Sequence, residues 1–314
     1  MQPARATMPD MSQDRATYQD VLDAGMPEPV KRFRAEIAQA RRVMDPQPYE
    51  TPYAPMQPLS AYALATRRHM HQYGTTRAQL AEVAVSARRW AQLNPDAFSR
   101  DALTIEDVVN ARMISDPLTV RDCCLVTDGG GAFIVVGADR ARDFPKPPVY
   151  LLGSGAAHWH RQIASMPDLT VTAATESGKR AYAMAGLHPS DIDVLQLYDA
   201  FTINTLLFLE DLGFCAKGES GPFVEGGRIG PGGELPVNTN GGGLSCVHPG
   251  MYGVFLVVEA VRQLRGECGA RQVMGAQTAL VAPIAKQNIS HTQHQHALVG
   301  RNFAQYLGVA EFML

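Results

Sequence analysis

The chain has 314 residues, and at about 150 residues per domain this length predicts two domains, each large enough to bury a core. Its 28 Lys and Arg against 31 Asp and Glu leave a net charge of −3, which disfavours nucleic acid and anionic membrane surfaces as partners. Five cysteines without a CxxC pair indicate neither a disulfide framework nor a metal site, so we expect a protein of the reducing cytoplasm.

The N-terminal part, residues 1–50, predicts a variable arm. Its first 20 residues lack the apolar core of a secretory signal, and no run in the chain reaches the roughly 20 apolar residues of a membrane span. One amphipathic stretch, Val30–Val43, predicts a peripheral helix. Three prolines between Pro52 and Pro58 favour an extended connection, so we place a boundary near Glu50.

Helices are predicted next, and strand signatures follow them. Leu59–Tyr73 ends before a glycine, and Thr75-Thr76 can cap a second helix over Arg77–Asn94. A third, short helix is predicted over Thr104–Ala111. The pattern then changes to two apolar, β-branched runs on either side of a glycine-rich turn, which are typical of strands: Cys124–Val126 and Ala132–Val136.

The proline cluster Pro145–Pro148 marks a domain linker, and after it strands and helices alternate as in an α/β fold. The expected elements are strand Val149–Leu152, helix Val171–Ala185, strand Ile192–Leu197, helix Phe201–Leu212, helix Met251–Leu264 and strand Gln277–Val281. The tail breaks this pattern, because Lys286–His296 is polar and Phe303–Leu314 predicts only a weak helix. The predicted parts are an arm over 1–50, an N-terminal part over 51–146, a C-terminal domain over 147–282 and an atypical tail over 283–314.

The first candidate site follows the predicted strand Ile192–Leu197. This strand delivers Tyr198 and Asp199 to the carboxyl edge of the sheet, where open α/β folds bind ligands. Asp199 can also cap the next helix. A packed aromatic ring and a simple helix cap explain the two residues equally well, so both interpretations stay open.

The second candidate site is a glycine-rich segment before the predicted helix Met251–Leu264. Its consecutive glycines, Gly241–Gly243, let the backbone approach a ligand closely. Pro249 suits the first turn of the helix, so His248 and Tyr252 are expected at its positive end, which favours a carbonyl oxygen that becomes an oxyanion. A glycine turn with a hydrogen-bonded histidine is the alternative.

Together these segments resemble the thiolase superfamily. Gly241–Gly243 followed by His248-Pro249 is similar to its glycine-rich, Gly-His-Pro active-site segment, and Tyr198–Phe201 stands where thiolases have Asn-Glu-Ala-Phe. Further similarity, to the lipid-transfer-protein and sterol-carrier-protein branch, lies in Tyr73–Thr76, Pro117-Leu118, Asp122–Cys124, Val126–Gly129 and Leu212–Cys215. The resemblance spans Tyr53 to Val281 and implies the layered αβαβα fold of thiolases.

The chain also departs from that family, in which a nucleophilic cysteine lies in the first α/β half and an acid/base cysteine near the end. No cysteine precedes Cys123. From Pro283 onward the sequence replaces the expected glycine-rich closing segment and last strand. We therefore expect an incomplete first half, a mostly present second half, and core or loop roles for Cys123, Cys124 and Cys246.

The segments around Tyr198 and Tyr252 resemble those of one sub-branch, the thiolase-like aldolases of steroid side-chain breakdown. These enzymes cleave a β-hydroxyacyl-CoA by retro-aldol chemistry without a cysteine nucleophile. The resemblance implies catalytic roles for Tyr198, Asp199, His248 and Tyr252. His248 is the expected oxyanion donor, and the residue that acts as the base is left open. It also implies acyl-CoA binding by Gly241, Gly242, Gly243 and Gly250.

The predicted function is therefore retro-aldol cleavage in lipid or steroid catabolism, with a coenzyme A thioester as substrate and no bound cofactor. Analogy implies a homodimer and a small zinc-ribbon/OB-fold partner protein. Two alternatives stay open. The first is an acyltransferase of the acetyl-CoA acetyltransferase type, and the second is a non-catalytic subunit or a truncated thiolase-like protein.

Overall fold

The computed structural model divides the chain into two compact units, Met1–Pro55 and Met56–Leu314. It describes residues 51–56, 58–159, 166–250, 252–282, 294–302 and 312–313, together with isolated positions between 28 and 35. The helix predicted over Val30–Val43 therefore lies for the most part outside the described residues. The four predicted parts of the chain stay a prediction.

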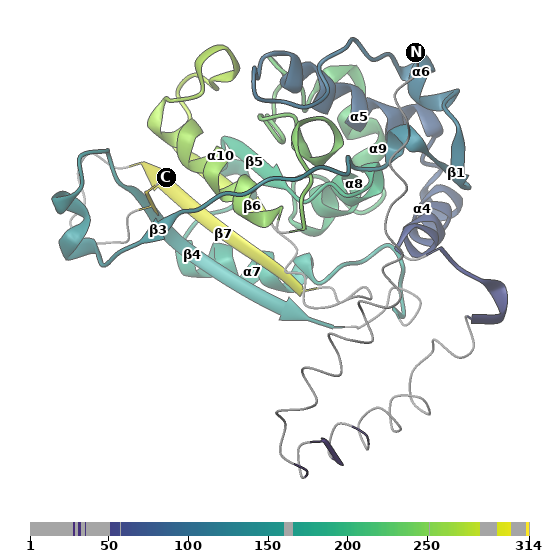
Figure 1. The fold of residues 1–314 in the computed structure, drawn as a ribbon, viewed down its shortest axis with the longest axis horizontal. Coiled ribbons are helices and arrows are strands. Elements are labelled where there is room, and N and C mark those ends of the chain that lie inside the picture. Colours follow the sequence, from purple (N-terminus) through teal and green to yellow (C-terminus); the bar gives the residue numbers. More distant parts are fainter. Residues whose placement is uncertain are drawn as a thin grey trace, which may run out of the picture. The chain divides into compact units, whose positions relative to one another are not determined.

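A four-stranded sheet is the centre of the larger unit (Figure 1). Its strands, in spatial order, are β4 (Val149–His158), β7 (His294–Asn302), β6 (Thr278–Ala282) and β5 (Val194–Leu197). β5 and β6 are parallel, whereas β7 runs antiparallel to both β4 and β6. The sheet is therefore mixed, and β5 lies at one of its edges.

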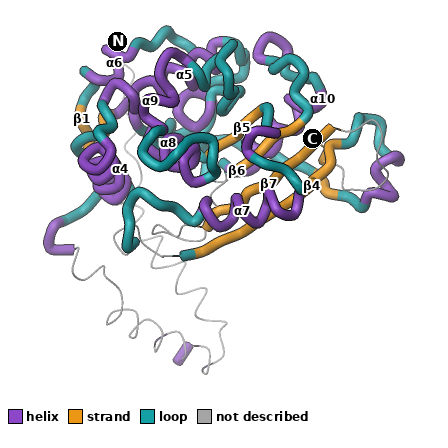
Figure 2. Tube along the Cα trace, turned by 180° about the vertical axis from the view of Figure 1, so that it is seen from behind, coloured by secondary structure: helices purple, strands orange, loops and turns teal. Residues whose placement is uncertain are grey.

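Helices cover both faces of this sheet (Figures 1 and 2). They are α7 (Ala174–Ala185), α8 (Thr202–Asp211) and α10 (Gly253–Arg265). Successive residues of a strand point to opposite faces. Val194 of β5 accordingly packs in one core with Leu256 of α10, whereas Leu195 packs in another with Ala181 of α7 and Leu206 of α8. The described residues thus form an α/β arrangement of three layers, compared with the αβαβα layers that the resemblance implies, and the α/β class predicted from the alternation of elements is confirmed.

Three further helices come before the sheet: α4 (Leu59–Tyr73), α5 (Arg77–Gln92) and α6 (Ile105–Val109). α4 ends where Gly74 adopts a left-handed φ of 76°, and α5 begins where the Thr76 hydroxyl accepts the Gln79 backbone N–H at 3.2 Å. These local signals are readable in the sequence, and the three predicted helices are confirmed. The short elements β1 (Met113–Ser115), β2 (Leu118–Thr119) and α9 (Ser220–Val224) complete this part.

Two predictions about strands are wrong. Cys124–Val126 belongs to no strand, because two of its backbone N–H groups donate to carbonyls outside any strand: Cys124 to the Ala200 carbonyl at 2.8 Å and Leu125 to the Gly243 carbonyl at 2.9 Å. Only β3 (Ile134–Val135) forms from the second predicted run, and it pairs with β8 (Phe312–Met313).

The tail from Pro283 also differs from its prediction as a polar tail with a weak helix. Part of it is β7, which is paired on both sides within the central sheet. Phe312 and Met313, within the predicted helix Phe303–Leu314, form strand β8. The other residues of that predicted helix lie outside the described residues. A last strand is therefore present, contrary to the expectation that the tail had replaced it.

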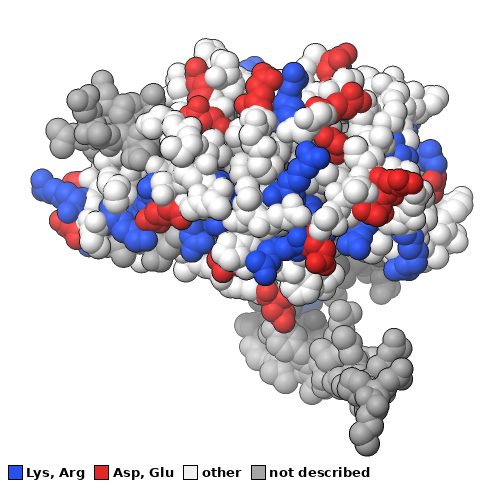
Figure 3. All heavy atoms as spheres, turned by 90° about the horizontal axis from the view of Figure 1, so that it is seen from above, with Lys and Arg blue, Asp and Glu red and all other residues white. Residues whose placement is uncertain are grey.

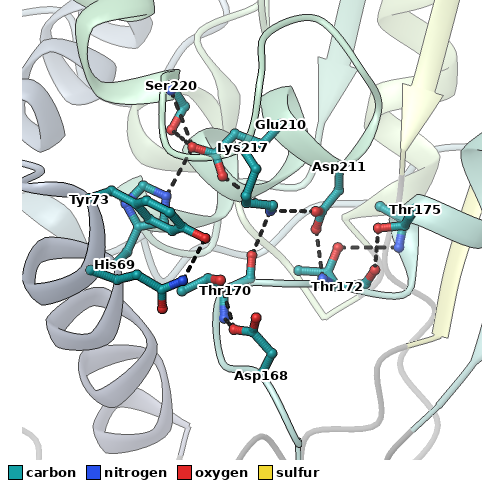
Figure 4. Close-up of polar contacts among 12 residues, drawn as sticks. His69, Tyr73, Asp168, Thr170, Thr172, Thr175, Glu210, Asp211, Lys217 and Ser220 are labelled. Atoms are coloured by element: carbon teal, nitrogen blue, oxygen red, sulfur yellow. Dashed lines mark hydrogen bonds and ion pairs between the residues drawn. The ribbon is translucent and has the colours of Figure 1, made fainter.

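A buried polar network joins α4 to the end of α8 (Figure 4). His69 lies between the Thr75 hydroxyl, at 2.7 Å, and Glu210 Oε1, at 3.0 Å. Lys217 Nζ forms an ion pair with Glu210 Oε2 at 3.1 Å. Burial alone would raise the pKa of Glu210, but hydrogen bonds from His69 and Ser220 outweigh it and lower the pKa to about 2. This network of hydrogen bonds and one ion pair fixes α4 against α8.

Positive and negative side chains are interspersed on the surface shown in Figure 3, in line with the near balance of charges in the sequence. Of the helices within the described ranges, none has the length and apolar content needed to cross a membrane.

Candidate active site

The first candidate segment lies where β5 ends. Tyr198 extends the pairing of β5 by donating its backbone N–H to the Ala282 carbonyl at 3.1 Å. α8 then begins at Thr202, and its start is capped by Asn204, whose Oδ1 accepts the Phe201 N–H at 3.1 Å. Asp199 therefore does not cap α8, contrary to the sequence prediction.

The Asp199 carboxylate instead holds the glycine-rich segment. Its side chain is fully buried, and it accepts the backbone N–H of Gly243 at 2.7 Å and that of Leu244 at 3.3 Å. Burial raises the pKa of Asp199 to about 7, against the opposing effect of these hydrogen bonds. The carboxyl group is therefore poised to gain or lose a proton near neutral pH.

The three consecutive glycines are required by close packing. A Cβ on Gly241 would lie 2.6 Å from the Ala91 Cβ, one on Gly242 would overlap Asp199 Oδ2, and one on Gly243 would lie 2.6 Å from the His248 Cδ2. Gly241 and Gly242 also have positive φ angles of 105° and 66°.

The backbone N–H groups of these glycines donate within the protein. Gly241 donates to the Asn238 carbonyl at 2.8 Å, Gly242 to Asn240 Oδ1 at 2.8 Å and Gly243 to Asp199. Gly250 differs, because a Cβ there would meet no atom within 4 Å. Contact of the four glycines with an acyl-CoA stays a prediction.

Sequence reasoning missed two asparagines that shape this segment. Asn238 has a φ of 51°, and its Oδ1 accepts the Leu197 N–H at 2.7 Å, which ties the segment to β5. Asn240 supports Gly242, as described above. Asparagine tolerates left-handed φ and bonds nearby backbone groups, so the Asn-Thr-Asn run before the glycines was the available signal.

His248 and Tyr252 come between the glycines and α10. α10 begins at Gly253 with Tyr252 as its N-cap, so the prediction that Pro249 lies in the first helical turn is wrong. The helix was predicted to start at Met251, which lies outside the described residues. The His248 backbone N–H donates to the Thr127 hydroxyl at 2.9 Å.

The structure brings three predicted side chains together. The ring centres of Tyr198 and His248 are 5.5 Å apart, those of His248 and Tyr252 are 5.1 Å apart, and those of the two tyrosines are 6.0 Å apart. Residues separated by 54 positions in the sequence thus form one aromatic cluster beside the buried Asp199.

Both tyrosines are held in the neutral form. Burial raises the pKa of Tyr252 well above its ordinary value, and the negative charge of Asp199 raises it further. Burial likewise raises the pKa of Tyr198. Neither hydroxyl can act as a phenolate at neutral pH, although a neutral phenol can still pass a proton on.

The five cysteines form no disulfide, and four of them lack the features of an activated nucleophile. Burial raises the pKa of Cys123, Cys215 and Cys246 to about 12, and it raises that of Cys268 as well. A thiol with a raised pKa is scarcely ionised at pH 7. Within the described part of the chain, no group of three or more His, Cys, Asp or Glu could hold a metal ion.

Residues 155–295 match the family described as thiolase C-terminal domain-like. This chain is a thiolase-like protein. The thiolase-like chain is 42% identical over 223 residues to an acetyl-CoA acetyltransferase of Methanothermobacter thermautotrophicus, covering 70% of this chain and 58% of that protein. It is 40% identical over 250 residues to a steroid side-chain-cleaving aldolase of Thermomonospora curvata, covering 74% and 62%.

A solved structure, the Ltp2-ChsH2(DUF35) aldolase, superimposes on the thiolase-like chain with a TM-score of 0.72 at 32% identity, covering 82% of this chain and 66% of the other. The predicted thiolase-like α/β fold is thereby confirmed. The chain spans about three fifths of the length of the two curated relatives.

Proposed function

We propose that this thiolase-like chain cleaves a β-hydroxyacyl-CoA of lipid or steroid catabolism by a retro-aldol reaction. The observation that carries the proposal is the convergence of Tyr198, His248 and Tyr252 beside the buried Asp199. This cluster offers hydrogen-bond donors and a proton acceptor, which are the groups that retro-aldol cleavage needs. It contains no thiol with a lowered pKa.

The reaction breaks the bond between the α and β carbons of the substrate. A base takes the β-hydroxyl proton, the β carbon becomes a ketone, and the electron pair moves into the thioester as an enolate. In the proposal His248 donates a hydrogen bond to the thioester oxygen, where negative charge develops. Protonation of the α carbon then yields the shortened acyl-CoA.

We assign the proton path to Tyr252 and Asp199. The neutral Tyr252 hydroxyl takes the β-hydroxyl proton while it passes its own proton to Asp199, whose pKa of about 7 suits both directions. Asp199 returns the proton through Tyr252 to the α carbon. Tyr198 flanks His248 and completes the cluster, and no proton is gained or lost in the cycle.

The substrate of the proposed reaction is a coenzyme A thioester, and the steps above use no further cofactor. We also propose a small zinc-ribbon/OB-fold partner, because the solved aldolase named above is a complex with a DUF35 protein. A homodimer is part of the proposal through the family resemblance alone. A cytoplasmic location is part of the proposal, supported by five cysteines that form no disulfide.

An acyltransferase is the second candidate function, because one of the relatives described above is an acetyl-CoA acetyltransferase. Acyl transfer of the thiolase type needs an activated cysteine. The raised pKa values of Cys123, Cys215, Cys246 and Cys268 argue against such a role for those thiols. A non-catalytic subunit remains the third candidate.

Release of a ketone from a β-hydroxyacyl-CoA with a tertiary alcohol tests the proposal. The wild-type chain, assayed with a DUF35-type partner added, should release it, and Tyr252→Phe should lower the rate by on the order of 100-fold through loss of proton transfer. Tyr150→Phe, the same change in β4, should keep full activity. Equal rates for the two variants would exclude Tyr252 from the chemistry, and no ketone from the wild type would refute the proposed function.

A further inference from the structure

One stretch, residues Cys124–Gly131, which we call the strap, crosses both halves of the candidate site. Its Cys124 N–H donates to the Ala200 carbonyl, just after Asp199, and its Leu125 N–H donates to the Gly243 carbonyl. The Thr127 hydroxyl then accepts the His248 N–H at 2.9 Å. Within four residues the strap therefore bonds the turn after β5, the glycine segment and the histidine.

Close packing fixes the strap beyond Thr127, where it runs across the start of α10 toward β3 (Figure 1). A Cβ on Gly129 would lie 3.1 Å from Val247 Cγ2 and 3.2 Å from Phe255 Cζ, and one on Gly131 would lie 3.0 Å from Val254 Cγ1. The strap backbone thus lies directly against the residues on both sides of His248, and these contacts fix the strap beside the candidate site.

The backbone at His248 needs such an anchor. His248 precedes α10, which begins at Gly253, so no helical hydrogen bond holds its N–H group. A backbone N–H that is removed from water costs free energy unless an acceptor is supplied. The Thr127 hydroxyl is that acceptor, reached from a segment 121 residues earlier.

We propose that Thr127 is a positioning residue, which sets the imidazole of His248 by holding its main-chain N–H; this rests on the oxyanion role proposed for His248. The backbone of His248 carries the ring that lies 5.5 Å from Tyr198 and 5.1 Å from Tyr252. Rotation of that peptide moves the ring away from the thioester oxygen. Displacements of about 1 Å at a reacting centre cost on the order of 100-fold in rate.

Three substitutions test this assignment. Thr127→Val keeps the shape and removes the hydroxyl, Thr127→Ser keeps the hydroxyl, and Thr104→Val is the matched control. The Thr104 hydroxyl also accepts a backbone N–H, that of Asp107 at 3.1 Å, but at the exposed start of α6. Thermal melting checks folding, and Thr127→Ala replaces the valine variant if that variant does not fold.

Thr127→Val should lower kcat for β-hydroxyacyl-CoA cleavage by about 10- to 100-fold with KM changed less than about two-fold, because the ring is misplaced for the transition state. Thr127→Ser should restore kcat, and Thr104→Val should leave it unchanged. In histidine-labelled protein, Thr127→Val should also shift the His248 imidazole resonances, assigned by their loss in His248→Ala.

The two readouts separate this inference from the proposed function. If the wild type cleaves no β-hydroxyacyl-CoA but Thr127→Val shifts the His248 resonances and Thr127→Ser does not, the enzymatic proposal fails and the positioning role stands. If the His248 resonances and kcat of Thr127→Val match those of Thr104→Val, Thr127 does not position His248. Equal losses of kcat in Thr127→Val and Thr127→Ser would also overturn the positioning role, because the Thr127 hydroxyl would then be irrelevant.

Discussion

Asp199 should make the folded state less stable as the pH rises. Burial raises its pKa to about 7 in the folded protein, compared with an ordinary value of 3.8. As the pH rises from about 4 to about 7, the carboxyl group ionises in the unfolded chain but stays protonated in the folded one, so unfolding becomes easier. At about 1.4 kcal/mol per pKa unit, the free energy of unfolding falls by about 4 kcal/mol across this window.

Chemical denaturation of the wild type and Asp199→Asn between pH 4 and pH 8 measures this effect. The wild-type free energy of unfolding, minus that of the variant, should fall by about 4 kcal/mol as the pH rises, because other titrating groups are common to both proteins. Asp107→Asn provides a control that should stay nearly flat, because hydrogen bonds from Thr104 lower the pKa of Asp107 and its contribution therefore changes only below about pH 4. A difference for Asp199→Asn that is flat or rises with pH would refute the account of Asp199.

The remaining predictions concern His248 and the glycines. His248→Ala should lower kcat by on the order of 100-fold, about 3 kcal/mol, with little change in KM, because an oxyanion donor acts mainly in the transition state; steady-state kinetics that show a raised KM and an unchanged kcat would contradict this role. Gly242→Ala should lower the free energy of unfolding by about 2–4 kcal/mol, since the new Cβ overlaps Asp199 Oδ2 at a φ of 66°. Gly250→Ala, at an open position, should unfold like the wild type in the same denaturation assay, and equal effects of the two changes would disprove the packing argument.

Local signals in the sequence were sufficient for most helices. Gly74 and Thr76 set the ends of α4 and α5 through left-handed φ and hydroxyl capping, which depend on neighbouring residues alone. The alternation of strands and helices after Pro148 predicted the α/β class, because it too depends on local patterns along the chain. Residues that end or begin an element locally are readable without the rest of the fold.

Contacts between distant segments could not be read in this way. The sequence of β7 is polar and has no alternating apolar pattern that would predict a strand. Its place between β4 and β6 depends on backbone pairing with those two strands. Asp199 was predicted to cap α8, but the glycine segment 44 residues later supplies its partners. The cluster of Tyr198, His248 and Tyr252 was anticipated through family resemblance, because its geometry depends on how β5 and the start of α10 meet.

The dependence of cleavage on free coenzyme A tests the central claim most directly. A retro-aldol enzyme needs no free CoA, whereas acyl transfer from a β-ketoacyl-CoA consumes it and needs a cysteine nucleophile. Mass spectrometry of reactions without added CoA should find a ketone and a shortened acyl-CoA in equal amounts from the β-hydroxyacyl-CoA, and no acetyl-CoA from acetoacetyl-CoA when CoA is added. Rapid conversion of acetoacetyl-CoA with CoA, and no cleavage of the β-hydroxyacyl-CoA, would contradict the account.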